Sequence, residues 1–408
     1  MRMNSAKPTA LHEIGGKPII DRMLPGVAES SLSCPAIVEN ASGLISAHVG
    51  ERARCFIQQA PLGEADALLA ARSVIEAAGD GLVLVLYGNL PLLESDYIDA
   101  VVRAAGKDRA AMLVFSDEET EELQPSGVFC FEGTLLLKAL LKADPADSVA
   151  DCAALLAEEG VETHELMISA ASVPQVTDRA GIALCESLLK ASVLEKHFAA
   201  GVTVLDPVST HIGEDVIIGR DAVIHPGVTL SGNTVIGEGS VIKGGCQLHD
   251  TRIGKGCTLT YVVANDAAVG DSVTVGPFVN LRPKTDIADG CKIGDFVEVK
   301  NSSVGKGTKL PHLSYIGDAD VGSGVNVGCG CVFVNYDGFK KHRTTVGNNV
   351  FLGCQTNLVA PVTVGDDAYT AAGSTITQDV PAGAMAFARV KQSNKIGYVE
   401  KFRSLKKK

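Results

Sequence analysis

The sequence contains no tryptophan, and only 5% of its residues are aromatic, whereas it has 43 glycines. This combination is unsuited to one thick aromatic core and favours a fold with many tight corners and thin layers. At 408 residues the chain also exceeds what one hydrophobic core commonly supports. We therefore expect two domains of different kinds.

Excess positive charge, cysteine pairs and long apolar runs are also missing. The formal net charge is −12, whereas a general nucleic-acid binder needs a basic surface that neutralises phosphates. The cysteines include no Cys-x-x-Cys pair, and Cys329 and Cys331 are too close for ordinary zinc-ligand spacing. No stretch is long enough to span a bilayer, and residues 1–16 lack the apolar segment of a signal peptide. We expect a cytoplasmic protein with reduced thiols that binds neither nucleic acid nor membrane.

Positive charge is nevertheless concentrated in two short segments. Lys340, Lys341, His342 and Arg343 are consecutive, and residues 406–408 are all lysine. Such clusters attract anions, although solvated surface charge is the commoner explanation of a lysine tail. A specific anionic ligand therefore remains open as a hypothesis.

An apolar residue recurs every six positions in the second half of the chain. A period of six fits neither an α-helix nor a two-residue strand repeat. It is typical of a triangular solenoid, in which each short strand turns one aliphatic side chain inward and three hexapeptides complete one coil. The uninterrupted runs are Ile212, Ile218, Ile224, Leu230, Ile236, Ile242 and Leu248; Val269, Val275, Leu281, Ile287, Ile293 and Val299; and Val346, Leu352, Leu358 and Val364.

The repeat is interrupted at residues 301–310 and 334–345, where we expect loops that carry chemistry. Upstream of the repeat, the first 183 residues have an α/β pattern, with a buried strand at 81–87 and helices at 64–78 and 135–143. The spacing of apolar residues at 182–199 indicates a bridging helix. We therefore expect an α/β domain at 1–181, a linker helix at 182–200, a β-helix at 201–385 and a C-terminal arm at 386–408.

Five motifs follow one another in the solenoid: Gly276-Pro277-Phe278, Leu281-Arg282-Pro283, Gly294-Asp295-Phe296-Val297-Glu298, His312-Leu313-Ser314-Tyr315-Ile316-Gly317-Asp318 and Asn335-Tyr336-Asp337-Gly338. In this order they resemble the acetyltransferase half of the bifunctional bacterial family of N-acetylglucosamine-1-phosphate uridyltransferase and glucosamine-1-phosphate acetyltransferase. The resemblance implies left-handed coils, a homotrimer, and acetyl transfer from acetyl-CoA to glucosamine 1-phosphate without a metal. The family's product is UDP-N-acetylglucosamine.

Acetyl transfer to a sugar amine needs a base, because a protonated amine cannot attack. His312 is the candidate, although a lone histidine in a loop is more often structural. The resemblance identifies His312 as the general base and Glu298 as the carboxylate that orients its ring. It also implies that five residues hold the sugar phosphate: Arg282, Lys300, Tyr315, Asn326 and Lys341.

The resemblance also implies a site for acetyl-CoA and assigns Asn335 a part in catalysis. Two residues depart from the family pattern: Cys354 replaces a serine that returns a proton to the leaving thiolate, and Cys329 replaces an alanine. A thiol donates more weakly than a hydroxyl but can still transfer a proton near neutrality. An alternative to this proton-donor role is that Cys354 acts as a covalent nucleophile. The implied acetyl-CoA-binding residues are Asn335, Tyr336, Cys329, Cys354, Ala372 and Arg389.

The first 16 residues resemble the middle of the same family's uridyltransferase signature. Of the glycine-rich segment L-x-x-G-x-G-T-R-M, which cradles UTP phosphates, only Arg2-Met3 is present. Thr9 stands in place of the phosphate-binding lysine of P-K-x-L-H. Asn89 replaces the magnesium-binding aspartate of Y-G-D, and a neutral amide binds magnesium more weakly than a carboxylate.

Three further elements of that signature also differ. Glu64 occupies the hydroxyl position of the uridine-binding Q-x-G-T segment, and the second metal-binding asparagine aligns with Thr177 or Asp178. Residues 125–127 are all that remains of the G-Y-G-R and N-T-G elements. A wrongly assigned start codon would explain the missing loop but neither Thr9 nor Asn89. We therefore predict that uridyltransferase activity and its Mg²⁺ site are lost, so that a separate uridyltransferase would complete the pathway.

Three alternatives remain open at this point. The chain is an intact bifunctional uridyltransferase and acetyltransferase, a non-catalytic regulatory or assembly protein, or a hexapeptide acyltransferase that acts on another amino sugar. Consumption of UTP with magnesium would favour the first alternative, and loss of the acetyl-transfer residues would favour the second.

Overall fold

A computed structural model describes residues 3–29, 35–116, 123–169 and 172–405. The chain divides into two compact units, Met1–Ala191 and Ser192–Lys408. The division falls within helix α8 (Arg179–Ala199), which corresponds to the expected bridging helix and begins three residues before its expected start.

The first unit is built around a mixed sheet with strand order β5-β7-β6-β8. Strand β7 (Leu123–Glu132) is antiparallel to both β5 (Leu82–Leu86) and β6 (Ala110–Ser116), whereas β8 (His164–Met167) is parallel to β6. Successive side chains of β7 alternate between two hydrophobic clusters, because strand residues point to opposite faces. Phe129 and Phe131 face one cluster, and Val128 and Cys130 face the other; all four are fully buried.

Helices cover both faces of this sheet. Helices α3 (Glu64–Ala70), α4 (Arg72–Ala78), α6 (Gly133–Leu140) and α7 (Val149–Glu158) contribute to the cluster around Phe129. Helices α1 (Ile19–Glu29), α5 (Ser95–Asp108) and the first half of α8 contribute to the opposite cluster. The α/β prediction for this unit is therefore confirmed. The expected helix at 64–78 is two helices that meet at Ala71, which is in neither. The remaining elements are η1 (Thr9–Leu11), β1 (Glu13–Ile14), β2 (Lys17–Pro18), β3 (Ala36–Asn40), α2 (Leu44–Val49), η2 (Gly50–Arg52) and β4 (Arg54–Gln58).

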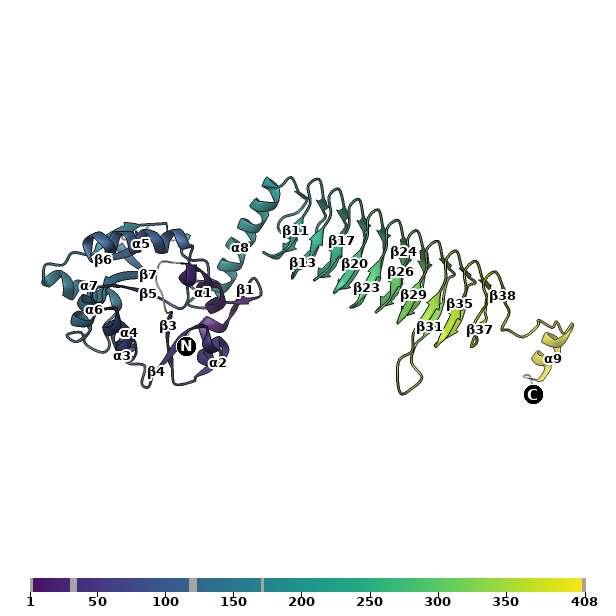
Figure 1. Cartoon of the computed structure of the whole chain (residues 1–408), viewed down its shortest axis with the longest axis horizontal. Coiled ribbons are helices and arrows are strands. Elements are labelled where there is room, and N and C mark those ends of the chain that lie inside the picture. The colour runs from purple at the N-terminus through teal and green to yellow at the C-terminus, as the bar shows by residue number, and fades with distance from the viewer. Residues whose placement is uncertain (1–2, 30–34, 117–122, 170–171, 406–408) are drawn as a thin grey trace. The chain divides into compact units, whose positions relative to one another are not determined.

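The second unit is a parallel β-helix in which strands β9 to β38 form three sheets (Figure 1). The first sheet contains β10 (His211–Ile212), β13 (Thr229–Ser231), β16 (Gln247–His249), β19 (Val262–Asn265), β22 (Val279–Leu281), β25 (Glu298–Lys300), β28 (Tyr315–Gly317), β31 (Val332–Val334), β34 (Asn357–Val359) and β37 (Thr375–Ile376). The second sheet contains β11 (Ile217–Ile218), β14 (Val235–Ile236), β17 (Arg252–Ile253), β20 (Ala267–Val269), β23 (Thr285–Ile287), β26 (Ser303–Val304), β29 (Ala319–Val321), β32 (Thr344–Val346) and β35 (Val362–Val364). The third sheet contains β9 (Thr203–Val204), β12 (Val223–Ile224), β15 (Val241–Ile242), β18 (Thr258–Leu259), β21 (Thr274–Val275), β24 (Lys292–Asp295), β27 (Lys309–His312), β30 (Asn326–Val327), β33 (Phe351–Leu352), β36 (Tyr369–Thr370) and β38 (Met385–Ala386).

The six-residue repeat supplies the core of the solenoid. Ile212, Leu230 and Leu248 occupy equivalent positions in neighbouring coils and are buried, as are their counterparts farther along the first sheet. Tight stacking also needs glycine beside some of these strands: a Cβ on Gly294 would overlap the backbone of Pro311 in the next coil. The apolar repeat therefore predicted the solenoid correctly.

Only one of the two expected interruptions is an extended loop. Residues 335–343 leave the solenoid between β31 and β32 as a long loop, as predicted (Figure 1). The prediction of a loop at 301–310 was wrong, because β26 and β27 continue the coil there. The inward-facing residues Val299 and Val304 are five rather than six positions apart, so the corner simply has one residue fewer.

The solenoid begins at Thr203, one strand before Ile212, and its last strand is followed by an exposed arm. Helix α9 (Tyr398–Leu405) in this arm has no buried residue. The basic tail at 406–408 and Arg2 lie outside the described residues. Among the helices that the structure describes, none is long and apolar enough to cross a bilayer.

Candidate functional site

One corner column of the β-helix carries several of the predicted site residues. Asp295 pairs with His312 between β24 and β27. Farther along, Val327 pairs with Leu352, and Leu352 with Thr370. The residues two positions later, Cys329, Cys354 and Ala372, are therefore stacked in successive coils. At this corner the backbone N–H of Gln355 donates to the carbonyl of Cys329, and that of Gly373 donates to the carbonyl of Cys354. The column consists of Asp295, His312, Cys329, Cys354 and Ala372.

His312 contacts Asp295, not the carboxylate that the sequence predicted. Nδ1 of His312 lies 2.6 Å from Oδ1 of Asp295, and this contact lowers the pKa of Asp295. A carboxylate can only accept here, so Nδ1 carries the proton and Nε2 is left as the basic nitrogen. Contrary to the prediction, this structure does not bring Glu298 into contact with His312. Glu298 is in β25 on the first sheet, three residues after Asp295, and its neighbour in the next strand is Tyr315.

Glu298 instead pairs with Arg282. Nη1 of Arg282 donates to Oε1 of Glu298 at 2.8 Å, and both side chains are more than one-third exposed. An exposed ion pair of this kind contributes only about 0–1 kcal/mol. Arg282 is therefore free to exchange this partner for a bound phosphate at little cost.

The three cations assigned to the sugar phosphate lie close together. Contact with Lys341, and then the Asp318 carboxylate, raise the pKa of Lys300, whereas the Lys300 ammonium lowers the pKa of Lys341. The Arg282 charge lowers the pKa of Lys341 further. A dianion beside these side chains would favour the charged form of all three. The structure thus brings Arg282, Lys300 and Lys341 into one cationic cluster on and beside the first sheet.

Tyr315 lies at the edge of this cluster. Its ring covers Gly317, where a Cβ would overlap the phenol. Nδ2 of Asn335 donates to Oη of Tyr315 at 3.3 Å. Tyr315 is thus brought together with Asn335 and with Glu298, its neighbour in the sheet.

The buried carboxylate of Asp318 connects the cationic cluster to the projecting loop. It accepts from Nδ2 of Asn335 at 2.5 Å and from Nδ2 of Asn301 at 2.6 Å, and Nζ of Lys300 lies 3.5 Å from each of its oxygens. Burial alone would raise the pKa of Asp318, but these hydrogen bonds and the Lys300 charge outweigh it and lower the pKa. Asp318 therefore remains ionised and holds three neighbouring side chains.

The other end of the loop is fixed by a second aspartate. Arg343 donates from Nε and Nη2 to the two oxygens of Asp320, at 2.5 Å each, and from Nη1 to the carbonyl of Asn301 at 3.0 Å. Paired bonds between a guanidinium and a carboxylate fix orientation as well as distance. The loop that carries Tyr336 and Lys341 is thereby anchored at its base.

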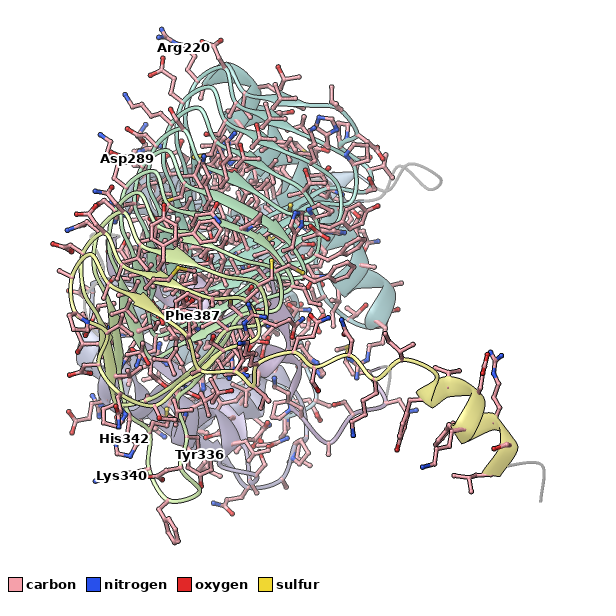
Figure 2. All side chains as sticks on the ribbon, turned by 90° about the vertical axis from the view of Figure 1, so that its right-hand side faces the viewer. Arg220, Asp289, Tyr336, Lys340, His342 and Phe387 are labelled. Atoms are coloured by element: carbon pink, nitrogen blue, oxygen red, sulfur yellow. The ribbon has the colours of Figure 1, made fainter. Side chains whose placement is uncertain are left out.

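Within the loop, Asp337 organises the turn. Its carboxylate accepts the backbone N–H groups of Phe339 and Lys340 at 2.8 Å each and contacts His342 at 2.6 Å. The Lys340 amide, followed by His342, lowers the pKa of Asp337 to about 2. Figure 2 shows Tyr336, Lys340 and His342 on this projecting loop. The basic segment at 340–343 is thus divided between the cationic cluster and bonds that shape the loop.

Two predicted residues lie away from these contacts. Asn326 is on the third sheet, between Lys309 and Phe351 of the neighbouring coils. Arg389 is exposed in the segment that follows β38. The single chain therefore does not bring Asn326 or Arg389 to the cationic cluster.

Sequence reasoning missed the carboxylates that hold the site together. Asp295, Asp318 and Asp320 received no role, although the first two stand inside the motifs that carried the resemblance. The six-residue register alone does not reach Asp295, because three hexapeptides back from His312 is Gly294. The shortened corner between Val299 and Val304 brings Asp295 opposite the histidine. No sequence signal pointed to Asp320, since its partner Arg343 is 23 positions away across the loop.

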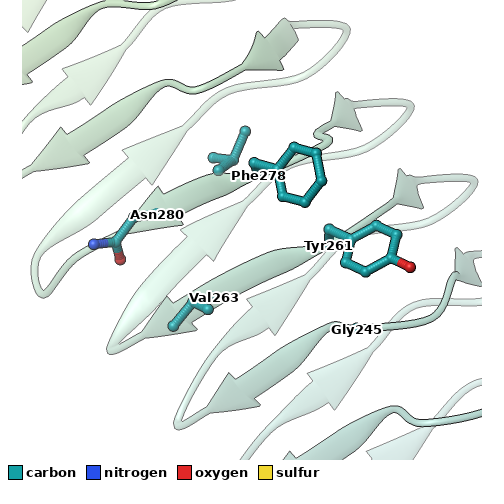
Figure 3. A pocket seen from close by; sticks show the side chains of 6 residues that line it. Gly245, Tyr261, Val263, Phe278 and Asn280 are labelled. Atoms are coloured by element: carbon teal, nitrogen blue, oxygen red, sulfur yellow. The ribbon is translucent and has the colours of Figure 1, made fainter.

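An exposed aromatic ridge runs along the corner beside the column. The rings of Tyr261 and Phe278 are 5.2 Å apart, and those of Phe278 and Phe296 are 5.3 Å apart. Leu313, next to His312, continues the ridge, and all four residues have positive φ and are 52–56% exposed. Beside it is an open hollow of about 400 Å³ lined partly by Val263 (Figure 3). A second hollow, of about 310 Å³, is lined by Thr274, Gly276, Lys292, Ile293, Gly294, Asp295, Pro311 and His312.

In the first unit, the positions of the uridyltransferase signature are engaged in structural contacts. Glu64 accepts from Oη of Tyr87 at 2.6 Å and from the amide of Val149 at 3.0 Å. Nδ2 of Asn89 donates to the carbonyl of Val176 at 3.3 Å, while its Oδ1 is buried without a hydrogen-bond partner. Among the described residues no three His, Cys, Asp or Glu side chains form a group suited to a metal ion.

Comparison with known proteins gives consistent results for both units. Residues 1–179 match the family described as MobA-like NTP transferase domain, and residues 343–378 match the bacterial transferase hexapeptide family. The chain is similar to the protein named bifunctional protein GlmU of Geobacillus sp. (strain WCH70), with 36% identity over all of this chain and 96% of the relative. It is 37% identical to the proteins of that name from Brevibacillus brevis, over 98% of this chain and 95% of the relative, and Clostridium novyi, over 100% and 97%.

Proposed function

Because the chain belongs to the family of bifunctional GlmU proteins, with their hexapeptide-repeat acyltransferase domain, we propose that it is a glucosamine-1-phosphate N-acetyltransferase that has lost uridyltransferase activity. The product would be N-acetylglucosamine 1-phosphate, a precursor of UDP-N-acetylglucosamine. The observation that carries the proposal is the position of the His312–Asp295 pair, one corner away from the cationic cluster. The column from His312 through Cys354 to Ala372 would hold acetyl-CoA.

In the proposed reaction the cationic cluster binds the sugar phosphate. Arg282 exchanges Glu298 for phosphate oxygens, and Lys300 and Lys341 supply two further cations. A bound phosphate would favour the charged form of Lys341, whose pKa Lys300 and Arg282 lower. The cluster thereby fixes one end of the sugar, and Tyr315 and Asn335 approach it from the side.

His312 then performs the proton transfer. Nε2 takes a proton from the sugar ammonium, and the Asp295 carboxylate stabilises the resulting imidazolium through Nδ1. The free amine attacks the thioester carbonyl of acetyl-CoA, so that a C–N bond forms and the C–S bond breaks. Cys354, in the same column, would return a proton to the departing thiolate sulfur. The amine's second proton passes to water as the amide forms, and the His312 imidazolium returns its proton to the Cys354 thiolate, so that both groups regain their starting state and one proton is released overall.

The loss of uridyl transfer is supported by three side chains. The Mg²⁺ that this chemistry uses prefers carboxylate oxygens, whereas Asn89 offers one neutral amide oxygen and Asp178 is bonded to the Gly181 amide at 2.8 Å. These residues do not fit a magnesium site. Glu64, bonded to Tyr87, adds a negative charge where an anionic nucleotide would bind.

We also propose that the protein acts as a homotrimer in the cytoplasm. The exposed ridge of Tyr261, Phe278, Phe296 and Leu313 ends beside His312, so a subunit that covers it would also reach the site. Proteins with hexapeptide repeats typically trimerise. The ten described cysteines are all free, which suits a reducing compartment.

A paired assay of the purified protein tests the proposal. One reaction measures thiol release from acetyl-CoA with glucosamine 1-phosphate. The other measures pyrophosphate release from UTP with N-acetylglucosamine 1-phosphate and magnesium. We expect thiol release alone. Pyrophosphate release would contradict the interpretation of Asn89 and Glu64, and the absence of both products would favour a regulatory or assembly role.

A further inference from the structure

We propose that Asp318 is a positioning residue for acetyl transfer: its carboxylate fixes the orientation of the Asn335 amide and so presents the Asn335 carbonyl oxygen to the reacting amine. This inference rests on the proposed acetyltransferase function. It concerns a residue that touches neither substrate and acts through its neighbours.

Asp318 is built into the site rather than exposed on it. Its side chain is 8% exposed, and it occupies the corner between β28 and β29 with φ of 51°. It contacts side chains from two directions: Lys300 and Asn301 from the preceding coil, and Asn335 from the projecting loop. A single buried carboxylate therefore links the cationic cluster to the loop.

The carboxylate determines which way the Asn335 amide faces. An ionised carboxylate accepts hydrogen bonds but cannot donate them. The Asn335 group at 2.5 Å from Asp318 must therefore be the NH₂. That nitrogen also lies within 3.3 Å of Oη of Tyr315, so both of its protons have partners. Oδ1 of Asn335 is left as the acceptor that can orient a sugar N–H for attack.

An asparagine at position 318 would remove this constraint. An amide both donates and accepts, so the Asn335 amide could turn over and present its NH₂ to the substrate. The backbone would not oppose the change, because asparagine readily adopts positive φ. Misplacement of a reacting group by about 1 Å costs up to about 100-fold in rate.

The same substitution has the opposite effect on phosphate binding. Asp318 is a counter-ion for Lys300 and offsets part of the positive charge of the cluster. With a neutral side chain in its place, Lys300 would offer its full charge to the phosphate. Asp318→Asn should therefore lower kcat without raising the KM for glucosamine 1-phosphate. A residue that only maintained the fold would impair both.

A matched control exists in the same corner of the solenoid. Asp250 also has positive φ, 46°, and also bonds a neighbouring coil, through the Asn233 amide at 2.8 Å. It lies four coils before Asp318, about 19 Å at the usual strand spacing. Asp250→Asn changes the same charge in the same backbone setting, away from Asn335.

The experiment measures kcat and both KM values for wild type, Asp318→Asn and Asp250→Asn, with calorimetric binding of glucosamine 1-phosphate in the absence of acetyl-CoA. We expect Asp318→Asn to lower kcat about 10- to 100-fold, with unchanged or tighter sugar-phosphate binding, and Asp250→Asn to match wild type. Unchanged kcat in Asp318→Asn, or weakened sugar binding, would overturn the inference.

A double-mutant cycle with Asn335→Ala separates positioning through Asn335 from any other role. If Asp318 acts through Asn335, adding Asp318→Asn to Asn335→Ala should change kcat less than twofold. Additive losses would refute the inference. Should wild type release no thiol at all, the proposed function fails instead, so the two failures are distinguishable.

Discussion

His312 and Asp295 face each other across one step of the solenoid, with Nδ1 and Oδ1 2.6 Å apart. The pair is formed by register alone, since the two residues are aligned partners in adjacent strands. Asp295 thus makes the contact with His312 that the resemblance assigned to Glu298, and Glu298 pairs with Arg282 instead. This exchange of partners changes which variants should alter the pH dependence of the reaction.

Asp295→Asn should lower kcat about 10- to 100-fold and move the acid limb of the pH–rate profile to lower pH. The hydrogen bond with His312 lowers the pKa of Asp295, so its charged form is favoured in the folded state. Asp295 therefore stays anionic throughout the acid limb, and its contribution is lost only as the pH falls below its ordinary carboxyl range. Without this charge the imidazolium that forms in the reaction loses its counter-ion.

Glu298→Gln serves as the comparison for the Asp295 variant. It removes a carboxylate from the same coil but not from His312. We expect its acid limb to coincide with that of wild type in steady-state kinetics from pH 5 to 9. A shifted limb in Glu298→Gln, with none in Asp295→Asn, would show that Glu298 is the partner in the working enzyme.

Gly317→Ala should raise the KM for glucosamine 1-phosphate about 10-fold, because the new methyl group would overlap the Tyr315 ring. Gly317 does not have positive φ, so the effect is steric rather than conformational. Steady-state kinetics measures this change. Gly106→Ala is the control: nothing lies within 4 Å of its Cβ in helix α5, so we expect unchanged kinetics. Equal KM values for Gly317→Ala and wild type would remove Tyr315 from the sugar site.

Alkylation should modify Cys354 first and stop acetyl transfer, because Cys354 is the exposed cysteine of the described residues. Burial raises the pKa of Cys246 to about 11, so that thiol should react slowly. Peptide mapping after brief treatment with iodoacetamide, with and without acetyl-CoA, measures the site and its protection. Cys354→Ala should resist the reagent and retain reduced activity. Complete loss of activity in Cys354→Ala would instead identify Cys354 as a covalent nucleophile.

If the proposed homotrimer forms through the aromatic ridge, Phe278→Asp should dissociate it, because the substitution places a charge in the middle of the ridge. Light scattering coupled to gel filtration gives the mass directly. Val208→Asp introduces the same charge at a position that is 84% exposed and outside the ridge, and we expect it to leave the mass unchanged. A trimeric Phe278→Asp protein would place the subunit contact elsewhere.

Glu64→Ala should destabilise the first unit by about 1–3 kcal/mol, since the Tyr87 hydroxyl and the Val149 amide lose their acceptor. The first transition in urea denaturation, followed by circular dichroism, reports this loss. Glu158→Ala, an exposed change at the end of α7, is the control and should have no effect. If Glu64→Ala were equally stable and gained UTP binding, Glu64 would be a block on a surviving nucleotide site.

The solenoid was predictable because one aliphatic side chain per strand recurs with a fixed period, and the structure buries those residues. The prediction of a loop at 301–310 was wrong because a corner that is one residue shorter interrupts the six-residue period, although the chain stays in the coil. Arg282, Lys300 and Lys341 were identified by resemblance, and the structure brings them together. Asp320 could not be found, because its pairing with Arg343 depends on where a long loop returns to the solenoid.

The stacking of Asp295 under His312 also limits how genes for such chains can change in length. A duplication or deletion of one whole coil before Val279 leaves the site residues in the same positions relative to one another. A change of one or two residues between 296 and 311 would rotate a different side chain over Asp295 and separate base from carboxylate. Inherited variation in length should therefore come in multiples of a coil upstream of the site, and in single residues only within the projecting loop.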